Sequence, residues 1–467
     1  IYKKEGVDMF LKLDNKEREN VAAISDNGNK VTYGDLMSFS NRVMDVLPER
    51  SLVFSLCHNT IGSLMGYVAF LSTRNVPLLL SADLDKELLH YLLDTYQPNY
   101  LWMPQKMADQ FDGNVVMSEY GYSLLSYSDK KIDMYPELAL LLTTSGSTGS
   151  PKLVRQSYTN IESNAQSIMQ YLELDETERP ITMLPMNYTY GLSVINSHLL
   201  VGATILMTDE SYAQKKFWDF FKSQGATSIV GVPFTYEILK KLRFFRMELP
   251  TLRYMTQAGG KLLPELHKEY AEYAIANDKR FYVMYGQTEA TARMSYLPYK
   301  RSLEKYGSMG IAIPGGTFHL IDVDGTDIEK ADVVGELVYE GPNVTLGYAE
   351  CQYDLSKGDE RNGILVTGDM AKRDEDGYYY IVGRKKRFLK IYGNRVNLDE
   401  TERMIQSQFD GMECACVGED DHMQIYVTDK NMEKDVTEFI TNKTGLNWKA
   451  FTCLLYTSDA ADDSLRV

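Results

Sequence analysis

The chain is poor in cysteine and has no long hydrophobic run. Five cysteines occur in 467 residues, which is an odd number and too few for a disulfide framework, so we interpret them as reduced. Cys414 and Cys416 form a C-x-C pair, but no second pair or histidine follows at zinc-site spacing. No apolar segment is long enough to cross a bilayer, and the chain does not open on a signal-peptide pattern. We therefore expect a cytoplasmic protein with no membrane span.

Positive charge is also scarce. Lysine and arginine total 49 against 65 acidic residues, so the formal net charge is −16. Nucleic-acid binding requires lysine and arginine contacts to phosphates, and the charge balance argues against such a partner. A basic and aromatic cluster at residues 240–246 is the main exception, and the exposed end of an amphipathic helix explains it better than a nucleic-acid surface.

Short apolar segments alternate with helical patterns along most of the chain. Strands are predicted at 52–56, 76–80, 100–103, 138–142, 181–184, 204–207 and 228–232, and helices near 31–47, 61–73, 86–96, 159–172 and 215–224 and from 192. This alternation is typical of an α/β fold with mainly parallel sheets flanked by helices. From about residue 307, strands such as 318–322 and 335–339 dominate, which predicts a β-rich subdomain.

A loop of small hydroxyl residues follows the buried strand at 138–142. It reads TTSGSTGSPK, ends on Lys152, and is predicted to lie between that strand and the helix at 159–172. Loops that combine backbone N–H groups, hydroxyls and a cation bind phosphate, and glycine lets the backbone approach the ligand. The Walker A pattern does not fit, because Ser150 and Pro151 separate Gly149 from Lys152. A plain polar loop with a solvated lysine is the alternative.

Five further polar segments follow predicted strands: PMNYTYG (185–191), AGG (258–260), YGQTE (285–289), TGD (367–369) and GR (383–384). Ligands of α/β folds bind where strands end. Thr288 offers a hydroxyl to a phosphate, and Glu289 offers an oxygen ligand to Mg²⁺. Asp369 can accept hydrogen bonds from two ribose hydroxyls, and Gly259 and Gly260 let an adenine lie against the backbone. A turn role for Asp369 and a helix-capping role for Glu289 are the alternatives.

These motifs resemble those of the adenylate-forming superfamily, which includes acyl- and aryl-CoA synthetases, peptide-synthetase adenylation domains and firefly-type luciferases. TSGSTGSPK looks like the family's phosphate loop, YGQTE its second signature, TGD its ribose motif and GRKKRFLKIYGNRV its hinge motif. The resemblance is closest in style to acyl-CoA synthetases. It implies attack of a carboxylate on the α-phosphate of ATP, release of pyrophosphate, and transfer of the acyl group to a thiol of CoA or of carrier-protein phosphopantetheine.

The resemblance also implies roles for individual residues. The ATP-binding set would be Thr144, Ser145, Gly146, Ser147, Thr148, Gly149, Lys152, Gly259, Gly260, Tyr285, Gly286, Gln287, Thr288, Asp369 and Arg384. Glu289 would bind Mg²⁺, and Thr288, Glu289, Lys152 and Lys390 would act in catalysis. A hinge at Lys386 would rotate a small mobile C-terminal domain, so that Lys390 and Gly393 face the site only during thiol transfer.

The segment PMNYTYG occupies the family's acid-binding region. The expected pocket residues are Tyr188, Gly191, Val232, Pro233, Gln257, Gly259 and Met284. Peptide-synthetase adenylation domains carry an aspartate here that pairs with the substrate's α-ammonium, whereas no acidic residue lies near Tyr188. Because a buried ammonium without a partner is costly, a small carboxylic acid without an α-amino group is favoured. Many acyl-CoA synthetases have histidine where Tyr188 stands, so the sequence departs from the family there.

The expected organisation is a large N-terminal domain (1–383, β-rich at about 307–383) and a small α+β C-terminal domain (384–452). Family members end with a strand, a Gly-Lys pair and a short helix, and that lysine bridges the acid and the α-phosphate. Residues 453–467 contain neither lysine nor glycine, so we expect a non-native tail, a truncated domain and an impaired ligase. A catalytically impaired nucleotide-binding homologue and an amino-acid-activating adenylation domain are the alternatives.

Overall fold

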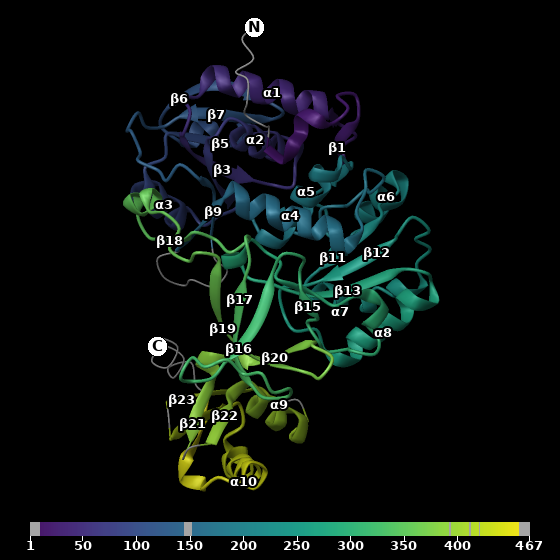
Figure 1. Ribbon diagram of the computed structural model, residues 1–467, viewed down its shortest axis with the longest axis vertical. Helices are drawn as coiled ribbons and strands as arrows, with labels where there is room; N and C mark the ends of the chain where they lie inside the picture. The colour runs from purple at the N-terminus through teal and green to yellow at the C-terminus, as the bar shows by residue number, and fades with distance from the viewer. Residues whose placement is uncertain (1–9, 144–151, 392–393, 411, 420, 457–467) are drawn as a thin grey trace. The chain divides into compact units, whose positions relative to one another are not determined.

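The computed structural model describes residues 10–143, 152–391, 394–410, 412–419 and 421–456 (Figure 1). Internal contacts divide the chain into two units. The first comprises residues 1–318, 339–365 and 377–379, and the second comprises 319–338, 366–376 and 380–467. Each unit has hydrophobic clusters of its own. The boundary expected at 383–384 stays a prediction.

The first unit contains helices and strands in alternation. Its helices are α1 (Tyr33–Val46), α2 (Ile61–Ser72), α3 (Lys86–Tyr96), α4 (Tyr158–Leu172), α5 (Thr189–Val201), α6 (Lys215–Gln224), α7 (Pro233–Lys241) and α8 (Pro264–Ala276). Its strands are β1 (Val21–Ser25), β2 (Lys30–Thr32), β3 (Leu52–Cys57), β4 (Val76–Ser81), β5 (Tyr100–Pro104), β6 (Asn114–Glu119), β7 (Tyr122–Ser126), β8 (Leu138–Thr143), β9 (Leu153–Ser157), β10 (Ile205–Met207), β11 (Ser228–Gly231), β12 (Tyr254–Gln257), β13 (Arg280–Tyr285), β14 (Ser295–Tyr296), β15 (Ile311–Ala312) and β18 (Gly347–Ala349).

The largest sheet has eight strands in the order β18-β9-β8-β4-β3-β5-β7-β6. Its four central strands are parallel, and the strands on both flanks pair antiparallel. The central strand β3 is buried along its whole length, as expected of a strand covered on both faces. The helices α4 and α5 pack side by side (Figure 1). The predicted α/β fold is confirmed, with sheets that are mixed rather than mainly parallel.

A second sheet, of order β11-β12-β13-β14-β15, brings the carboxyl ends of three parallel strands to one edge. Gly231 pairs with Gln257, and Gln257 pairs with Val283. The residues that follow these three strands therefore start from the same edge of the sheet. A third, small sheet has the order β10-β1-β2.

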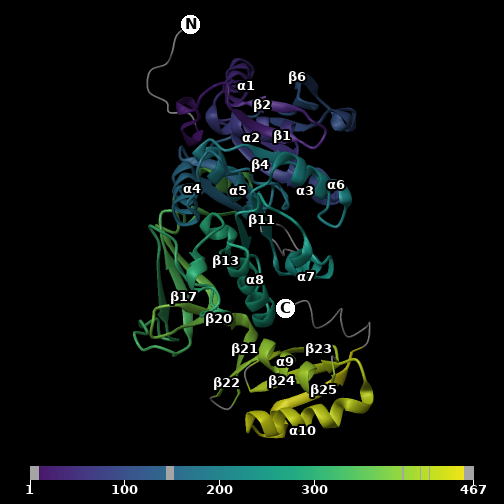
Figure 2. The same ribbon diagram turned by 90° about the vertical axis from the view of Figure 1, so that its right-hand side faces the viewer.

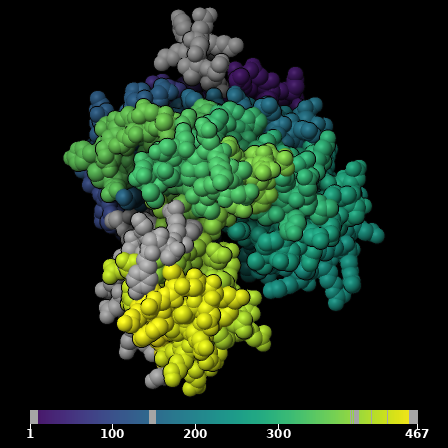
Figure 3. All heavy atoms as spheres, turned by 60° about the horizontal axis from the view of Figure 1, so that its bottom comes forward, coloured from purple at the N-terminus to yellow at the C-terminus, as the bar shows by residue number. Residues whose placement is uncertain are grey.

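The second unit holds most of a four-stranded sheet of order β16-β17-β19-β20, a hairpin, and a three-stranded sheet with two helices. The elements are β16 (Thr317–Ile321), β17 (Gly335–Glu340), β19 (Ile364–Arg373), β20 (Tyr379–Arg384), β21 (Phe388–Ile391), β22 (Asn394–Asn397), α9 (Leu398–Gln408), β23 (Cys414–Glu419), β24 (His422–Val427), α10 (Glu433–Thr444) and β25 (Phe451–Leu455). Figure 2 shows α10 along the sheet β23-β24-β25, and Figure 3 shows these C-terminal residues, in yellow, as one packed body. The strand β25 runs across the tail boundary expected at 452–453.

Three local predictions were wrong. Residues 181–184 form no strand and make only an isolated bridge, between Ile181 and Leu206. The ladder does not continue because Thr182 uses its side-chain hydroxyl, not its backbone, to bond the backbone N–H and carbonyl of Thr208. The TTSGSTGSPK loop is followed by β9, not by a helix, so it connects two antiparallel strands. Thr367–Asp369 and Gly383–Arg384 lie inside β19 and β20 rather than after them. No helix in the described part of the chain is both long and apolar enough to cross a membrane.

Candidate nucleotide and acid site

Four of the predicted acid-pocket residues, Tyr188, Val232, Pro233 and Gly259, lie around the turn that follows β12. A Cβ added to Gly259, whose φ is +79°, would lie 2.7 Å from Tyr188 Oη and 3.1 Å from Val232 Cγ1. A Cβ on Gly260 would lie 3.0 Å from the Pro233 ring. The two glycines therefore let this turn lie directly against Tyr188, Val232 and Pro233. Burial raises the pKa of Tyr188.

Gln257 fixes the turn from within. Its Nε2 donates to the carbonyl oxygens of Ala258 (3.2 Å) and Gly260 (2.9 Å). Both acceptors are carbonyl oxygens, so the atom that faces them must be the amide nitrogen. The amide oxygen Oε1 therefore points away from these two carbonyls. Within the described part of the chain Oε1 is buried and accepts no hydrogen bond. Gly191, at the start of α5, is also sterically required, because a Cβ there would overlap the carbonyl oxygen of Pro185.

Met284 lies beside a buried guanidinium. Its Sδ accepts from Tyr171 Oη at 3.1 Å and contacts Arg293 Nη1 at 3.6 Å. Arg293 is 2% exposed, donates to Ser193 Oγ (3.1 Å) and Tyr171 Oη (2.9 Å), and lies 5.1 Å from the ring centroid of Tyr190. Over the described ranges, no carboxylate pairs with it. The sequence interpretation missed Arg293, although an arginine four residues after Glu289 in an apolar segment is an available signal.

Glu289 is held by a second segment of the chain. It lies in the 3₁₀ turn Thr288–Ala290. Its backbone carbonyl accepts from Thr345 N (3.0 Å), Thr345 Oγ1 (2.9 Å) and Arg361 Nη1 (3.0 Å). Its carboxylate accepts from Tyr348 Oη at 2.6 Å. Burial, together with this neighbouring carboxylate, raises the pKa of Tyr348 to about 12, so the phenol is the donor at neutral pH.

Lys152 lies next to the same tyrosine. Its Nζ is 2.7 Å from Glu350 Oε1 and 5.8 Å from the ring centroid of Tyr348. The structure thus brings the predicted phosphate-loop lysine and the predicted metal ligand to one side chain. Thr144, Ser145, Gly146, Ser147, Thr148 and Gly149 lie outside the described residues.

The rest of the YGQTE motif is tightly constrained. A Cβ on Gly286 would overlap the backbone carbonyl oxygen of Ala292, so glycine is required where the chain passes this close to itself. Gln287 Nε2 donates to Tyr285 Oη at 3.1 Å. Tyr285 is the last residue of β13, and these contacts fix the conformation of Gly286, Gln287 and Thr288, which follow it.

In the second unit, Asp369 and Arg384 pair with each other. Asp369 is buried in β19 after Gly368, whose φ is +70°. Its Oδ1 lies 2.8 Å from Arg384 Nε, and the Arg384 side chain is 62% exposed. The structure therefore brings two predicted nucleotide residues together within this unit.

The charged hinge motif is described only in part. Lys386 belongs to the 3₁₀ turn Lys385–Arg387 and Lys390 to β21, but their side chains lie outside the described residues, as does Gly393. Lys385 Nζ lies 2.7 Å from Glu336. Arg387 pairs with Asp399 and Glu402, at 2.8 and 2.5 Å.

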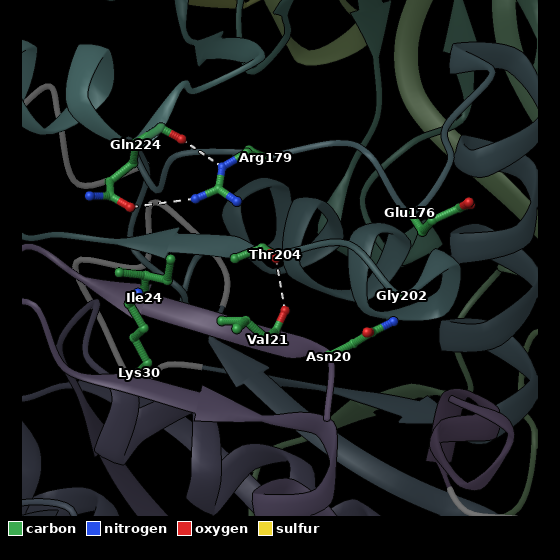
Figure 4. Close-up of a pocket in the computed structure, with 9 residues that line it drawn as sticks. All are labelled: Asn20, Val21, Ile24, Lys30, Glu176, Arg179, Gly202, Thr204 and Gln224. Atoms are coloured by element: carbon green, nitrogen blue, oxygen red, sulfur yellow. Dashed lines mark hydrogen bonds between the residues drawn. The ribbon is translucent and has the colours of Figure 1, made fainter. Parts of the chain in front are cut away.

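A pocket of about 400 Å³ lies elsewhere in the first unit (Figure 4). Its lining residues are Asn20, Val21, Ile24, Lys30, Glu176, Arg179, Gly202, Thr204 and Gln224. Arg179 Nε donates to the Gln224 carbonyl oxygen at 2.6 Å, and Thr204 Oγ1 to that of Val21 at 2.8 Å. None of the predicted site residues lines this pocket.

The chain matches the family model described as AMP-binding enzyme over residues 12–349. It belongs to the AMP-binding enzyme family. It is 29% identical over 290 residues to oxalate–CoA ligase of Arabidopsis thaliana, which is 60% of this chain and 55% of that protein. It is 25% identical over 428 residues to 2-succinylbenzoate–CoA ligase of Geobacillus sp., which is 90% of this chain and 81% of the relative. The chain thus spans about half the length of the first relative.

Solved structures share the fold of this chain. The o-succinylbenzoate CoA synthetase of Bacillus subtilis with its acyl-adenylate intermediate superposes with a TM-score of 0.76 at 20% identity, over 99% of this chain and 97% of the other. ATP-bound MatB of Rhodopseudomonas palustris superposes with a TM-score of 0.73 at 21% identity, over 96% and 95%. The AMP-binding family match includes Lys152, Tyr188, Glu289 and Tyr348, whereas Asp369 and the hinge motif follow it.

Proposed function

We propose that the chain is an AMP-forming ligase that activates a carboxylic acid and passes the acyl group to a thiol. A carboxylate oxygen bonds to the α-phosphorus of ATP, the bond from that phosphorus to the bridging oxygen breaks, and pyrophosphate leaves. The acyl-adenylate then reacts with the thiol of CoA, or of a carrier-protein phosphopantetheine, and releases AMP. The CoA ligases among its relatives support this reaction class.

The placement of Glu289 carries the proposal. Its carboxylate accepts one hydrogen bond from a neutral phenol and pairs with no cation in the described ranges. An anionic oxygen ligand of this kind fits Mg²⁺, which would neutralise phosphate charge when bound. Thr288 would donate a hydrogen bond from its hydroxyl to a phosphate. Lys152 would leave its ion pair with Glu350 and pair with phosphate oxygens instead. Asp369 would accept from the ribose hydroxyls, and Arg384 would contact the nucleotide.

The neighbourhood of Met284 supports an acid without an α-amino group. Arg293 contacts Met284 Sδ, is buried, and pairs with no carboxylate where the structure is described. A second cation near a buried guanidinium is disfavoured by like-charge repulsion and by desolvation. An amino acid would therefore bind poorly, and the amino-acid-activating alternative is disfavoured on this ground.

The deciding experiment traps the acyl-adenylate with hydroxylamine across a panel of acids. The panel holds aliphatic, aryl and dicarboxylic acids, and each non-amino acid is matched with its α-amino counterpart. Hydroxamate formed with a non-amino acid supports the proposal, and CoA or a phosphopantetheinylated carrier added afterwards identifies the acceptor. ATP binding without adenylate from any acid would favour the catalytically impaired homologue instead.

A further inference from the structure

Tyr348 contacts two of the segments proposed to bind ATP and Mg²⁺, the end of the TTSGSTGSPK loop and the YGQTE motif. It is the central residue of β18 and pairs with Val154 of β9, two residues after Lys152. Its ring centroid lies 5.8 Å from Lys152 Nζ, and its hydroxyl donates to Glu289 Oε1 at 2.6 Å. One side chain thus touches the lysine of the phosphate loop and the carboxylate of the YGQTE motif.

The two charges that meet at Tyr348 are opposite in sign but do not pair with each other. Lys152 pairs with Glu350, the residue two positions after Tyr348. Glu289 accepts from the neutral phenol. A direct Lys152–Glu289 ion pair would engage the charges proposed for phosphate and for Mg²⁺. Because the donor is a phenol and not a cation, the hydrogen bond fixes the orientation of the Glu289 carboxylate without pairing it with a positive charge.

Arg361 fixes the ring and the backbone beneath it. Its guanidinium lies 4.7 Å from the ring centroid of Tyr348, a stacking distance for arginine on an aromatic face. Its Nη1 also donates to the Glu289 carbonyl oxygen (3.0 Å) and to Thr345 Oγ1 (2.9 Å). Tyr348 and the backbone of Glu289 are therefore held by the same guanidinium, which limits movement of one relative to the other.

We propose that Tyr348 is a positioning residue that holds the Glu289 carboxylate ready for Mg²⁺ and apart from Lys152. The proposal rests on the metal-binding role proposed for Glu289. Tyr348 itself touches neither the metal nor the reacting atoms in this scheme. Loss of its hydroxyl should leave the fold intact and weaken only that part of ATP binding that depends on Mg²⁺.

The test is calorimetry of ATP binding to Tyr348→Phe with Mg²⁺ and with EDTA. We expect Mg²⁺-ATP affinity to fall about tenfold, equivalent to about 1.4 kcal/mol, and metal-free ATP affinity to change by less than about twofold. The Mg²⁺ concentration that gives half-maximal ATP binding should rise by a similar factor. Tyr353→Phe is the matched control, because Tyr353 is 85% exposed, and it should leave both affinities unchanged.

Glu289→Gln separates this inference from the proposed function. If Glu289→Gln removes the Mg²⁺ dependence while Tyr348→Phe keeps it, the positioning role is wrong and the metal site stands. If Glu289→Gln keeps the dependence, the proposed metal site fails and the inference fails with it. An equal loss of ATP affinity with and without Mg²⁺ in Tyr348→Phe would mean that the hydroxyl only supports packing. Should that variant not fold, Tyr348→Leu is measured in the same way and must show the same Mg²⁺-selective loss.

Discussion

Replacing Asp369 with asparagine tests the ribose role through the ion pair that the carboxylate makes in the second unit. Asp369 is buried, whereas its partner Arg384 is 62% exposed and approaches to 2.8 Å. Because the guanidinium is largely exposed, water screens the pair and solvates Arg384 once the pair opens. Hydrogen bonds from a ligand to a charged group contribute about 1.5–3 kcal/mol. Exchange of the guanidinium for two ribose hydroxyls is therefore favourable, and Asp369→Asn should weaken ATP binding by about 1.5–3 kcal/mol, or roughly 10- to 150-fold.

Calorimetry measures this loss directly, and thermal unfolding confirms that the variant folds. Asp332→Asn is a matched control within the same unit, because Asp332 pairs with Lys372 at 2.9 Å on the surface and has a φ of +59°, which asparagine tolerates. The control should change ATP affinity by less than about 0.5 kcal/mol. Unchanged ATP affinity in folded Asp369→Asn would refute the reasoning, and the carboxylate would then have a structural role only.

Three further outcomes are expected. Lys386→Pro fixes φ and should reduce thioester formation more than pyrophosphate exchange; equal loss of both would contradict a hinge. Gly286→Ala would force a Cβ into the Ala292 carbonyl oxygen. It should lower the free energy of unfolding by at least about 1–3 kcal/mol and abolish ATP binding. Wild-type values in urea unfolding and in calorimetry would instead show that the turn adapts. Burial lowers the pKa of His198 to about 4 from an ordinary 6.5. Between pH 6.5 and 4 the unfolded state therefore binds a proton that the folded state does not. The contribution of His198 to the free energy of unfolding should fall by roughly 2–4 kcal/mol over this range and stay level above pH 6.5. His198→Gln should remove that part of the urea-unfolding profile, and an unaltered profile would place the acid sensitivity in other groups.

The sequence predicted the elements whose pattern is local. The helices at 86–96 and 215–224 have the predicted bounds, because each begins and ends where its amphipathic period does. The edge of the sheet that carries 258–260 and 285–289 was also predictable, since parallel strands end together.

Other features depend on partners distant in sequence. Asp369 was expected after a strand because the apolar run 364–366 ends at Thr367, whereas β19 continues to Arg373 and Gly368 takes a positive φ within it. Strand β9 was missed because its residues, LVRQS, show no alternation of apolar and polar side chains, although its pairings with β8 and with distant β18 bury all five. Tyr348 and Arg361 belong to no recognisable motif. They follow Glu289 in the sequence by 59 and 72 residues, and only folding brings them into contact with it.

The pairing of β9 with β18 also has a consequence for the order in which the chain can assemble. Buried Arg155 of β9 donates to the Leu346 and Tyr348 carbonyl oxygens, which are 191 and 193 residues away. At ribosomal rates of about 5–20 residues per second, this partner segment emerges roughly 10–40 s after β9. Through that interval the β9 edge has unpaired backbone groups and Arg155 lacks its acceptors, so the nascent sheet is open to wrong strand pairing. Final closure of the largest sheet must wait until the YGQTE segment and everything up to β18 have been made.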